Sequence, residues 1–249
     1  MLPPVSILTV TQYSRQPTLL ILKDLLEAQT YSHIVEWVLV EGSQDRADAL
    51  ANAEFIQQIK TRIPISYIGT KGGYPIGTLR QIANEEAIGE IRVVMDDDDY
   101  YPPTRVAHAV ESLLRSGKQI AGCSPMLMMD YQAGKMIQFK SFGPNHSVSS
   151  AMAWVRDYPG LYDLKARKAE EGVFTNGFRE PMVQLDPALT IIQSSHGANT
   201  FPKTGLTHLV ELAECRVPEP FRSRYQKAFV GDIHPAFGGV ASPIPPVYL

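Results

Sequence analysis

Four consecutive aspartates, Asp96 to Asp99, directly follow a short segment rich in valine. If strand periodicity continues through them, Asp96 and Asp98 face one way, and Asp97 and Asp99 face the other. Two like charges ~4 Å apart repel by roughly 4 kcal/mol at an effective dielectric constant near 20, so a bare cluster is unfavourable. A divalent cation such as Mg²⁺ or Mn²⁺ relieves this repulsion and keeps coordination positions for phosphate oxygens. The run therefore predicts a site for a metal ion and a diphosphate.

The aspartate run also has a plainer interpretation, which is that it caps a helix. A helix is expected to begin near Pro103, and aspartate is favourable at a helix N-terminus because it accepts from free N–H groups. One carboxylate is enough for that purpose, and Asp99 suits it best. We therefore expect at least two of the four aspartates to bind the metal and the diphosphate.

The aspartates end a regular alternation of strands and helices. Apolar patterns predict strands over residues 5–10, 35–40, 65–68 and 91–95, with helices over 17–26, 45–60 and 78–87. This alternation predicts an α/β fold with a mostly parallel sheet, in which ligands bind beyond the carboxyl ends of the strands. Polar residues follow the strands at that edge, namely Thr11, Tyr13, Glu41, Ser43 and the four aspartates.

The second half of the chain is less regular. The predicted elements there are a helix over 103–116, a strand over 119–123, a hairpin over 126–139 and a segment of helical spacing over 206–215. Six prolines lie beyond Val217, which indicates an extended tail. We therefore predict one domain over residues 1–216, made of halves 1–101 and 102–216, and a proline-rich tail over 217–249.

Composition excludes several classes of protein. The 249 residues are 44% apolar and 20% charged, which is typical of a folded globular chain. A formal net charge of −3 gives no broad basic surface for nucleic acid. Cys123 and Cys215 form neither a zinc motif nor a disulfide framework, which favours a reducing, cytoplasmic location. No apolar run is long enough for a transmembrane helix, so any membrane contact is expected to be peripheral.

Several segments, taken in order, resemble the family-two glycosyltransferases of GT-A fold. Residues 77–87, the following Gly89-Glu90-Ile91 and the aspartate run resemble that family's arginine-asparagine helix, Gly-Glu strand and D-x-D metal motif. Residues 6–11 and 38–45 resemble its first strand and the acidic turn after its second. Further on, residues 169–174 resemble its "GED" segment, and residues 196–200 resemble its "HGxNT" segment. The resemblance covers residues 5–205.

The resemblance implies a fold and a reaction. The fold is a Rossmann-like, mostly parallel central sheet flanked by helices, with a nucleotide-sugar-binding half over 1–101 and a smaller, hairpin-containing acceptor half over 102–216. The reaction is transfer of a sugar from a nucleoside-diphosphate sugar, with a UDP-sugar favoured, to an acceptor hydroxyl. It is expected to invert the anomeric centre and to use Mn²⁺ or Mg²⁺, with a glycan, lipid-linked or protein acceptor.

The resemblance also implies roles for individual residues. The metal ligands would be Asp96, Asp98 and His196. The nucleotide would contact Thr11, Tyr13, Glu41, Ser43 and Asp97, while Arg80 would pair with the pyrophosphate or brace the aspartates. The general base would be Glu171, with Glu170 next, although the family usually has aspartate there.

Ordinary structural roles compete with these assignments. Glu170 and Glu171 end a charged stretch over 165–171 that fits the solvated face of a helix. His196 fits a hydrogen-bonded loop histidine, Arg80 fits a surface arginine on a helix, and Thr11 and Tyr13 fit turn residues.

Three other activities are compatible with parts of the sequence. Aspartates after a strand also hold Mg²⁺ in phosphoryl-transfer enzymes and phosphatases. A non-catalytic module that binds a nucleotide sugar or glycan is a further alternative, because Glu171 replaces the usual aspartate. A nucleotidylyltransferase is disfavoured, because residues 11–15 lack the glycine-rich loop expected after its first strand.

Overall fold

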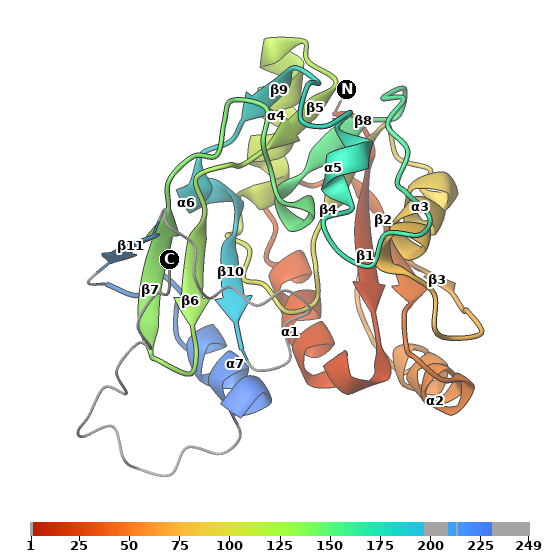
Figure 1. The fold of residues 1–249 in the computed structure, drawn as a ribbon. Coiled ribbons are helices and arrows are strands. Elements are labelled where there is room, and N and C mark those ends of the chain that lie inside the picture. The colour runs from red at the N-terminus through yellow and green to blue at the C-terminus, as the bar shows by residue number, and fades with distance from the viewer. Residues whose placement is uncertain (1, 197–208, 213, 231–249) are drawn as a thin grey trace.

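The protein was analysed as a computed structural model, which describes residues 2–196, 209–212 and 214–230 (Figure 1). A seven-stranded sheet has the strand order β3-β2-β1-β4-β8-β5-β9, and a four-stranded sheet has the order β10-β6-β7-β11. The strands of the larger sheet are β1 (Val5–Thr11), β2 (Ile34–Glu41), β3 (Ile65–Ile68), β4 (Ile91–Val94), β5 (Ile120–Gly122), β8 (Ala153–Val155) and β9 (Met182–Gln184). Those of the smaller sheet are β6 (Leu127–Asp130), β7 (Lys135–Phe139), β10 (Ile192–Ser195) and β11 (Leu209–Leu212).

The first four strands of the larger sheet run parallel to one another. β8 is antiparallel to both β4 and β5, while β5 and β9 are parallel. In the register of the central strands, Thr11 pairs with Glu41, and Leu8 pairs with Val94. The carboxyl ends of β1, β2 and β4 therefore meet at one edge of the sheet, where ligands bind in such folds.

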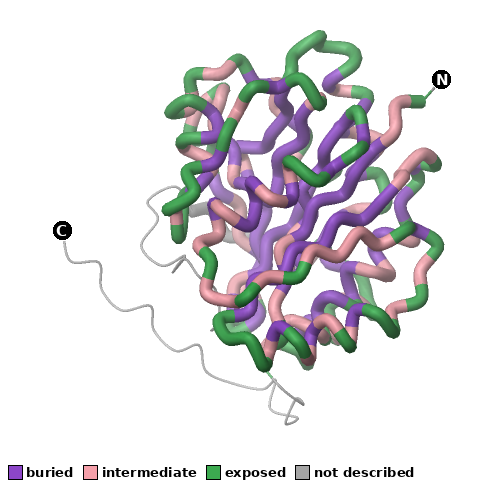
Figure 2. Tube along the Cα trace, turned by 90° about the vertical axis from the view of Figure 1, so that its right-hand side faces the viewer, coloured by how far each residue is buried: buried purple, intermediate pink, exposed green. Residues whose placement is uncertain are grey.

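Helices cover both faces of the larger sheet. α1 (Gln16–Glu27), α2 (Arg46–Ile56) and α4 (Arg105–Ser116) pack on one face, and α3 (Ile76–Glu86) packs on the other. Alternate residues of β2 serve the two layers, because Trp37 and Leu39 join the first core cluster while Val38 and Val40 join the second. Figure 2 shows these buried strands running through the centre of the molecule. A sheet covered on both faces has strands that are apolar on both sides, as the sequence of β2 is.

Sequence signals set the ends of several helices. Pro17 lies in the first turn of α1, where a missing backbone N–H costs nothing. Asp45 caps α2 by accepting from the backbone N–H of Asp48. Gly117 ends α4 with φ 64°, a left-handed conformation that glycine adopts without strain. These signals therefore fix where α1 and α2 begin and where α4 ends.

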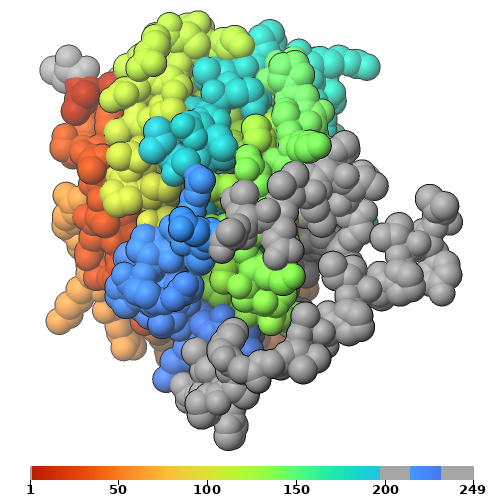
Figure 3. Space-filling view, turned by 90° about the vertical axis from the view of Figure 1, so that its left-hand side faces the viewer, coloured from red at the N-terminus to blue at the C-terminus, as the bar shows by residue number. Residues whose placement is uncertain are grey.

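The last described helix, α7 (Phe221–Val230), packs against α1 and beside the smaller sheet. Tyr131, just after β6, contacts the rings of Tyr225 and Phe229. Its backbone carbonyl also accepts from the side chain of Gln226. Figure 3 shows α7 in blue on this face of the molecule. α7 therefore contacts both α1, which covers the larger sheet, and the segment that follows β6 of the smaller sheet.

The structure confirms the predicted α/β architecture and the hairpin, which is β6 and β7. Two predictions about the later part of the chain are wrong. Residues 209–212 form strand β11, although their spacing suggested a helix, and residues 221–230 form α7, although the prolines suggested an extended tail. Residues 231–249 lie outside the described part. None of the described helices combines the length and apolar character that crossing a bilayer requires.

Candidate active site

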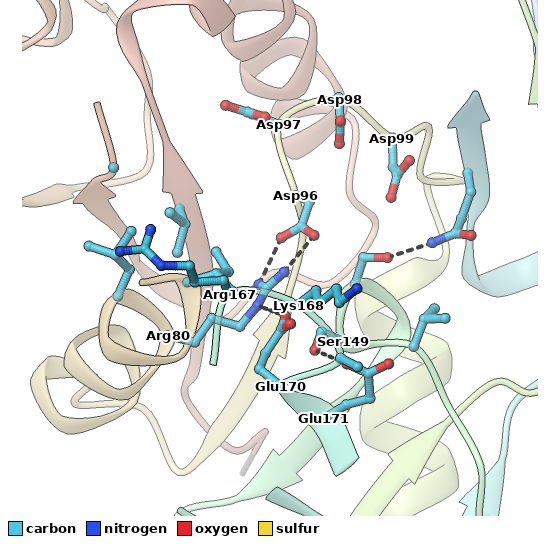
Figure 4. Close-up of a pocket in the computed structure, with 18 of the residues that line it drawn as sticks. Arg80, Asp96, Asp97, Asp98, Asp99, Ser149, Arg167, Lys168, Glu170 and Glu171 are labelled. Atoms are coloured by element: carbon cyan, nitrogen blue, oxygen red, sulfur yellow. Dashed lines mark hydrogen bonds and ion pairs between the residues drawn. The ribbon is translucent and has the colours of Figure 1, made fainter. Parts of the chain in front are cut away.

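A cavity of about 690 Å³ opens at the carboxyl edge of β1, β2 and β4. The aspartate run, Thr11, Arg15 and Arg80 form part of its wall, and Glu170 and Glu171 form another part. Figure 4 shows the acidic side chains converging on this space from the loop after β4 and from the start of α5 (Glu171–Phe174). The volume lies in the usual range for sites that bind small molecules.

Arg80 lies between two carboxylates at the floor of this cavity. Its Nη1 and Nη2 atoms donate to both oxygens of Asp96 at 2.9 and 2.8 Å, and its Nε donates to Oε1 of Glu170 at 2.7 Å. Burial opposes the charge of Arg80, but Asp96 and then Glu170 outweigh it and raise the pKa of the guanidinium. Arg80 is buried, so it is not the exposed surface arginine that the helical position allowed. It braces the first aspartate against the glutamate pair.

The four aspartates do not alternate as a strand would. β4 ends at Val94, and Asp97 and Asp98 lie in a turn, so each carboxylate has a different neighbourhood. Asp97 accepts from the Thr11 hydroxyl at 2.7 Å, and Asp99 accepts from the backbone N–H of Ser194 at 2.8 Å. Burial, followed by the Asp98 charge, raises the pKa of Asp97 well above its usual value. The expectation that Asp96 and Asp98 face one way is therefore wrong, because strand geometry stops before the run begins.

Asp98 has two nitrogen neighbours. Its Oδ2 atom lies 2.9 Å from Nη1 of Arg15 and 3.2 Å from Nε2 of His196. Arg15 and His196 are also 3.2 Å apart through the same two nitrogens. A cationic guanidinium thus lies beside the carboxylate and the imidazole that were predicted to share a metal ion.

His196 is held from behind by α7. Its ring stacks on Phe229 with a centroid distance of 3.9 Å and an interplanar angle of 7°. Four residues earlier, the hydroxyl of Tyr225 donates to the backbone carbonyl of Asp99 at 2.7 Å. Both contacts fix the acidic loop and His196 relative to one another. Of the predicted segment 196–200, only His196 lies within the described residues.

Glu170 and Glu171 are adjacent, yet their surroundings differ. Burial raises the pKa of Glu170, but the Arg80 guanidinium outweighs it, so the net effect is a lowered pKa. Among the residues that the structure describes, Glu171 has no such cationic partner, and the Ser149 hydroxyl donates to its Oε2 at 3.4 Å. Burial, and after it the Glu170 carboxylate, raises the pKa of Glu171. Glu171 is therefore the more basic of the two carboxylates.

The loop before these glutamates is tied to α3. Gly77 donates its N–H to the carbonyl of Ala166, and the Thr78 hydroxyl donates to the carbonyl of Leu164. A Cβ atom at Gly77 would lie 1.9 Å from the carbonyl oxygen of Asp163, so only glycine permits this approach. Ala169 follows with φ 52°, which is uncommon for a residue other than glycine and turns the chain toward the cavity. Residues 165–169 are therefore not the helix that the charged stretch suggested.

The three other predicted nucleotide contacts form a group beside the cavity. Glu41 is fully buried and accepts from the N–H of Ser43, the amide of Asn52 and the hydroxyl of Tyr67. Ser43 in turn accepts from the N–H of Tyr13. These side chains do not line the cavity, whereas Gly42 between them does. They hold the loops that follow β1 and β2 in register.

The metal prediction can be tested against this geometry. Within the described ranges, no three His, Cys, Asp or Glu side chains lie close enough together to hold a metal ion. Asp98 and His196 are brought together, while Asp96 is bound to Arg80. A carboxylate and an imidazole are ligands that suit Mn²⁺, with phosphate oxygens and water supplying the rest. The pair therefore fits a metal that is completed by the substrate.

Sequence reasoning missed three basic residues that line the cavity. Arg15 lies on the 3-10 turn Tyr13–Arg15 after β1, and Arg167 and Lys168 lie on the loop before Glu170. Figure 4 shows Lys168 among the acidic groups, whereas the end of the Arg167 side chain points away from them. The signal for the second pair was the basic run over 165–168, which was interpreted as a solvated helix face. Position alone gave no signal for Arg15.

Known proteins resemble this chain in sequence profile and in fold. The sequence profile of glycosyl transferase family 2 matches residues 6–139, more than half of the chain. S. aureus TarS 1-349 in complex with UDP-GlcNAc is 17% identical, with a TM-score of 0.58 over 79% of this chain and 60% of that one. The mannosyltransferase PcManGT from Pyrobaculum calidifontis, in complex with GDP-Man and Mn²⁺, is 15% identical, with a TM-score of 0.58 over 82% and 59%. No curated protein sequence matches the chain.

The likeness to these solved structures concerns the fold, and the chain spans less than two thirds of the length of either one. It confirms the predicted GT-A fold, with a mostly parallel seven-stranded sheet and a smaller second sheet. The profile match extends from β1 through β7 and includes Arg80 and the aspartate run. The chain belongs to glycosyl transferase family 2.

Proposed function

We propose that the protein transfers a glycosyl group from a nucleoside-diphosphate sugar to an acceptor hydroxyl, with inversion at the anomeric carbon. The observation that carries the proposal is the arrangement of the shared cavity. A wall of carboxylates and cations suits a diphosphate. Glu171, which has a raised pKa and no ion pair with the described residues, suits a hydroxyl that must lose its proton.

The donor would bind along the carboxyl edge of β1, β2 and β4. Thr11, Asp97 and Gly42 line the part of the cavity nearest these strands, where the base and ribose would lie. Glu41, Ser43 and Tyr13 would act by shaping the loops, because Glu41 already accepts three hydrogen bonds from the protein. Arg167 and Lys168 would face the diphosphate, since their cations suit oxyanions. We favour a UDP-sugar, and UDP-GlcNAc is the ligand of the TarS structure.

Asp98 and His196 would hold the divalent metal, and Asp96 would face it from the Arg80 side. When bound, the metal would neutralise charge that develops on the leaving diphosphate. The GDP-Man and Mn²⁺ bound to PcManGT support a metal of this kind. Arg15 would have to leave Asp98 or share it, because its Nη1 atom contacts the same oxygen as His196 does.

Glu171 would be the general base. It would take the proton of the acceptor hydroxyl as that oxygen bonds to the anomeric carbon. The bond from this carbon to the diphosphate oxygen breaks, and the nucleoside diphosphate leaves with the electron pair. Glu170 would remain paired with Arg80 and raise the basicity of its neighbour, so the two adjacent carboxylates would have separate roles.

Calorimetric titration with UDP, GDP and dTDP, each with Mn²⁺ and with EDTA, tests the donor site. We expect one nucleoside diphosphate to bind in a manganese-dependent manner. Asp98→Asn should abolish that dependence, while Asp130→Asn should not, because Asp130 caps an exposed turn after β6 and asparagine can do the same. Release of inorganic phosphate without any acceptor would favour a phosphatase instead.

A further inference from the structure

Two aromatic rings form part of the wall of the cavity that also holds the proposed base. Phe142 and His146 both line the cavity that contains Glu171. Their ring centroids are 5.0 Å apart, and a third ring, Phe178, lies 4.7 Å behind that of His146. Phe142 is 40% exposed although it lies against His146. An aromatic surface therefore faces the cavity in the acceptor half of the fold.

This aromatic surface is fixed by polar contacts beneath it. The buried Ser124 hydroxyl accepts from the backbone N–H of Phe142 at 2.7 Å and lies 3.4 Å from Nδ1 of His146. The side-chain amide of Gln184 donates to the backbone carbonyls of Pro144 and His146. The loop that carries the two rings is thus held before any ligand binds, which lowers the entropic cost of binding.

The same surface is linked to Glu171 through the end of α5. The Thr175 hydroxyl donates to the backbone carbonyl of Glu171 at 2.7 Å and accepts from the N–H of Phe178 at 3.2 Å. Phe178 has φ 58°, a conformation that is a genuine outlier for a bulky residue and that turns its ring toward His146. Backbone conformations of this cost are found where a site needs them. One turn therefore carries both the proposed base and Phe178, the ring that packs against His146.

The remaining wall of this part of the cavity has a mixed character. Met126 and Val148 are apolar, whereas Ser149, Ser150 and Gln193 are polar, and all five line the cavity. Burial lowers the pKa of His146, which favours a neutral ring there. An aliphatic chain would bring no hydrogen-bond partner to the polar groups. A pyranose has an apolar C–H face that suits an aromatic ring and a rim of hydroxyls that suits serine and glutamine.

We propose that the acceptor is a saccharide whose sugar ring stacks on Phe142 and His146 and presents one hydroxyl to Glu171. This inference rests on the proposed function, because Glu171 is taken as the base. It narrows the acceptor from any hydroxyl to one carried by a sugar ring.

Methyl labelling of the methionines supplies a test that does not need the donor to be known. The chain has 8 methionines, and Met126 lines the same cavity as the two rings. Its ¹³C-methyl signal can be assigned with Met126→Leu. The probes are the methyl glycosides of glucose, galactose, mannose and N-acetylglucosamine, with farnesyl phosphate as the aliphatic probe. We expect a saturable shift of the Met126 signal with at least one glycoside.

Substitutions at Phe142 separate aromatic stacking from apolar contact. Phe142→Leu should weaken glycoside binding by about tenfold, whereas Phe142→Tyr should retain it. Leu114→Ala, on the exposed side of α4, is the matched surface control and should leave the titration unchanged. Equal binding by Phe142→Leu and the unchanged protein would overturn the stacking role.

The other outcomes are equally decisive. A saturable shift with farnesyl phosphate and none with the glycosides would identify an isoprenoid acceptor and overturn the proposal. No shift with any glycoside would do the same. Calorimetry with UDP, GDP and dTDP, each with Mn²⁺, on the same preparation separates the two proposals. Binding of a nucleotide without binding of a glycoside rejects only the acceptor class, whereas absence of binding by all three nucleotides rejects the proposed function.

Discussion

The loop after β4 and the start of α5 both place adjacent carboxylates in the wall of one cavity. The repulsion between neighbouring carboxylates is reduced differently in the two segments. The aspartates are spread over separate partners, with Arg80, Thr11, Arg15 and the N–H of Ser194 each taking one. The glutamates stay side by side, with Glu170 neutralised by Arg80 and Glu171 left with a raised pKa. Carboxylates that have separate partners are suited to binding a cation and a diphosphate, whereas two adjacent carboxylates with different pKa values are suited to proton transfer.

The largest expected effect concerns Glu171. Glu171→Gln should lower kcat by about 10²–10⁴-fold, because the amide cannot take a proton from the acceptor hydroxyl. Donor binding should change little, because Glu171 forms no ion pair with the described residues and is not a proposed metal ligand. Steady-state kinetics together with UDP calorimetry would measure both quantities. If UDP binding fell by the same factor as kcat, Glu171 would contribute to donor binding, as the aspartates are proposed to do. The proposed difference in function between the two segments would then be wrong.

Removal of the cation that both regions share should come next. Arg80→Met leaves Asp96 and Glu170 without their common partner, and breaking a buried pair in this way costs about 3–5 kcal/mol of unfolding free energy. Urea denaturation measures the loss. Arg115→Met is the control, because that side chain is 80% exposed and lies 3.9 Å from Glu111 on the surface of α4. Equal stability of the two variants would show that Arg80 does not brace the site.

The smallest expected effect is a shift in the pH dependence of the rate. The ionised form of Glu171 acts as the base, so kcat should fall as the pH drops through its raised pKa. Glu170→Gln removes the neighbouring negative charge, which lowers the pKa of Glu171 and moves this acid limb to lower pH. Rate profiles of the two proteins between pH 4 and 8 would show the shift. An unchanged limb would mean that the pair is not electrostatically linked.

Sequence periodicity predicted the elements of residues 1–101 well, because the strands there are apolar on both faces and are followed by polar residues. Val38 and Val40 serve one core while Trp37 and Leu39 serve the other, so the run in β2 was unambiguous. The elements after residue 101 were harder to predict because most of the strands there are short. β8 has three residues, Ala153–Val155, and lies antiparallel between β4 and β5. The periodicity of apolar residues does not reveal which strands pair, so this position could not be predicted.

The predicted site residues were close to the cavity, but their partners were not predictable. Arg80 and Glu170 are 90 positions apart, and Asp98 and His196 are 98 apart, so only the fold brings them together. The sequence favoured Glu171 over Glu170 as the base only by resemblance. The physical difference between them comes from the fold, because Arg80 forms an ion pair with Glu170. Arg15 had no distinguishing pattern, since charged side chains on loops are common. The basic run that contains Arg167 and Lys168 was visible, but it fitted a solvated helix face equally well.

The contacts of α7 have a consequence for how the protein is made. Tyr225 holds the carbonyl of Asp99, and Phe229 covers the ring of His196, although the acidic loop is synthesised more than a hundred residues earlier. A ribosome-bound chain could therefore form the larger sheet before α7 is available. The loop of Asp96 to Asp99 would then lack its contact with Tyr225. The loop would gain its final support only after α7 emerges from the exit tunnel, so the appearance of a competent site would follow the last turn of that helix rather than the strand that carries the aspartates.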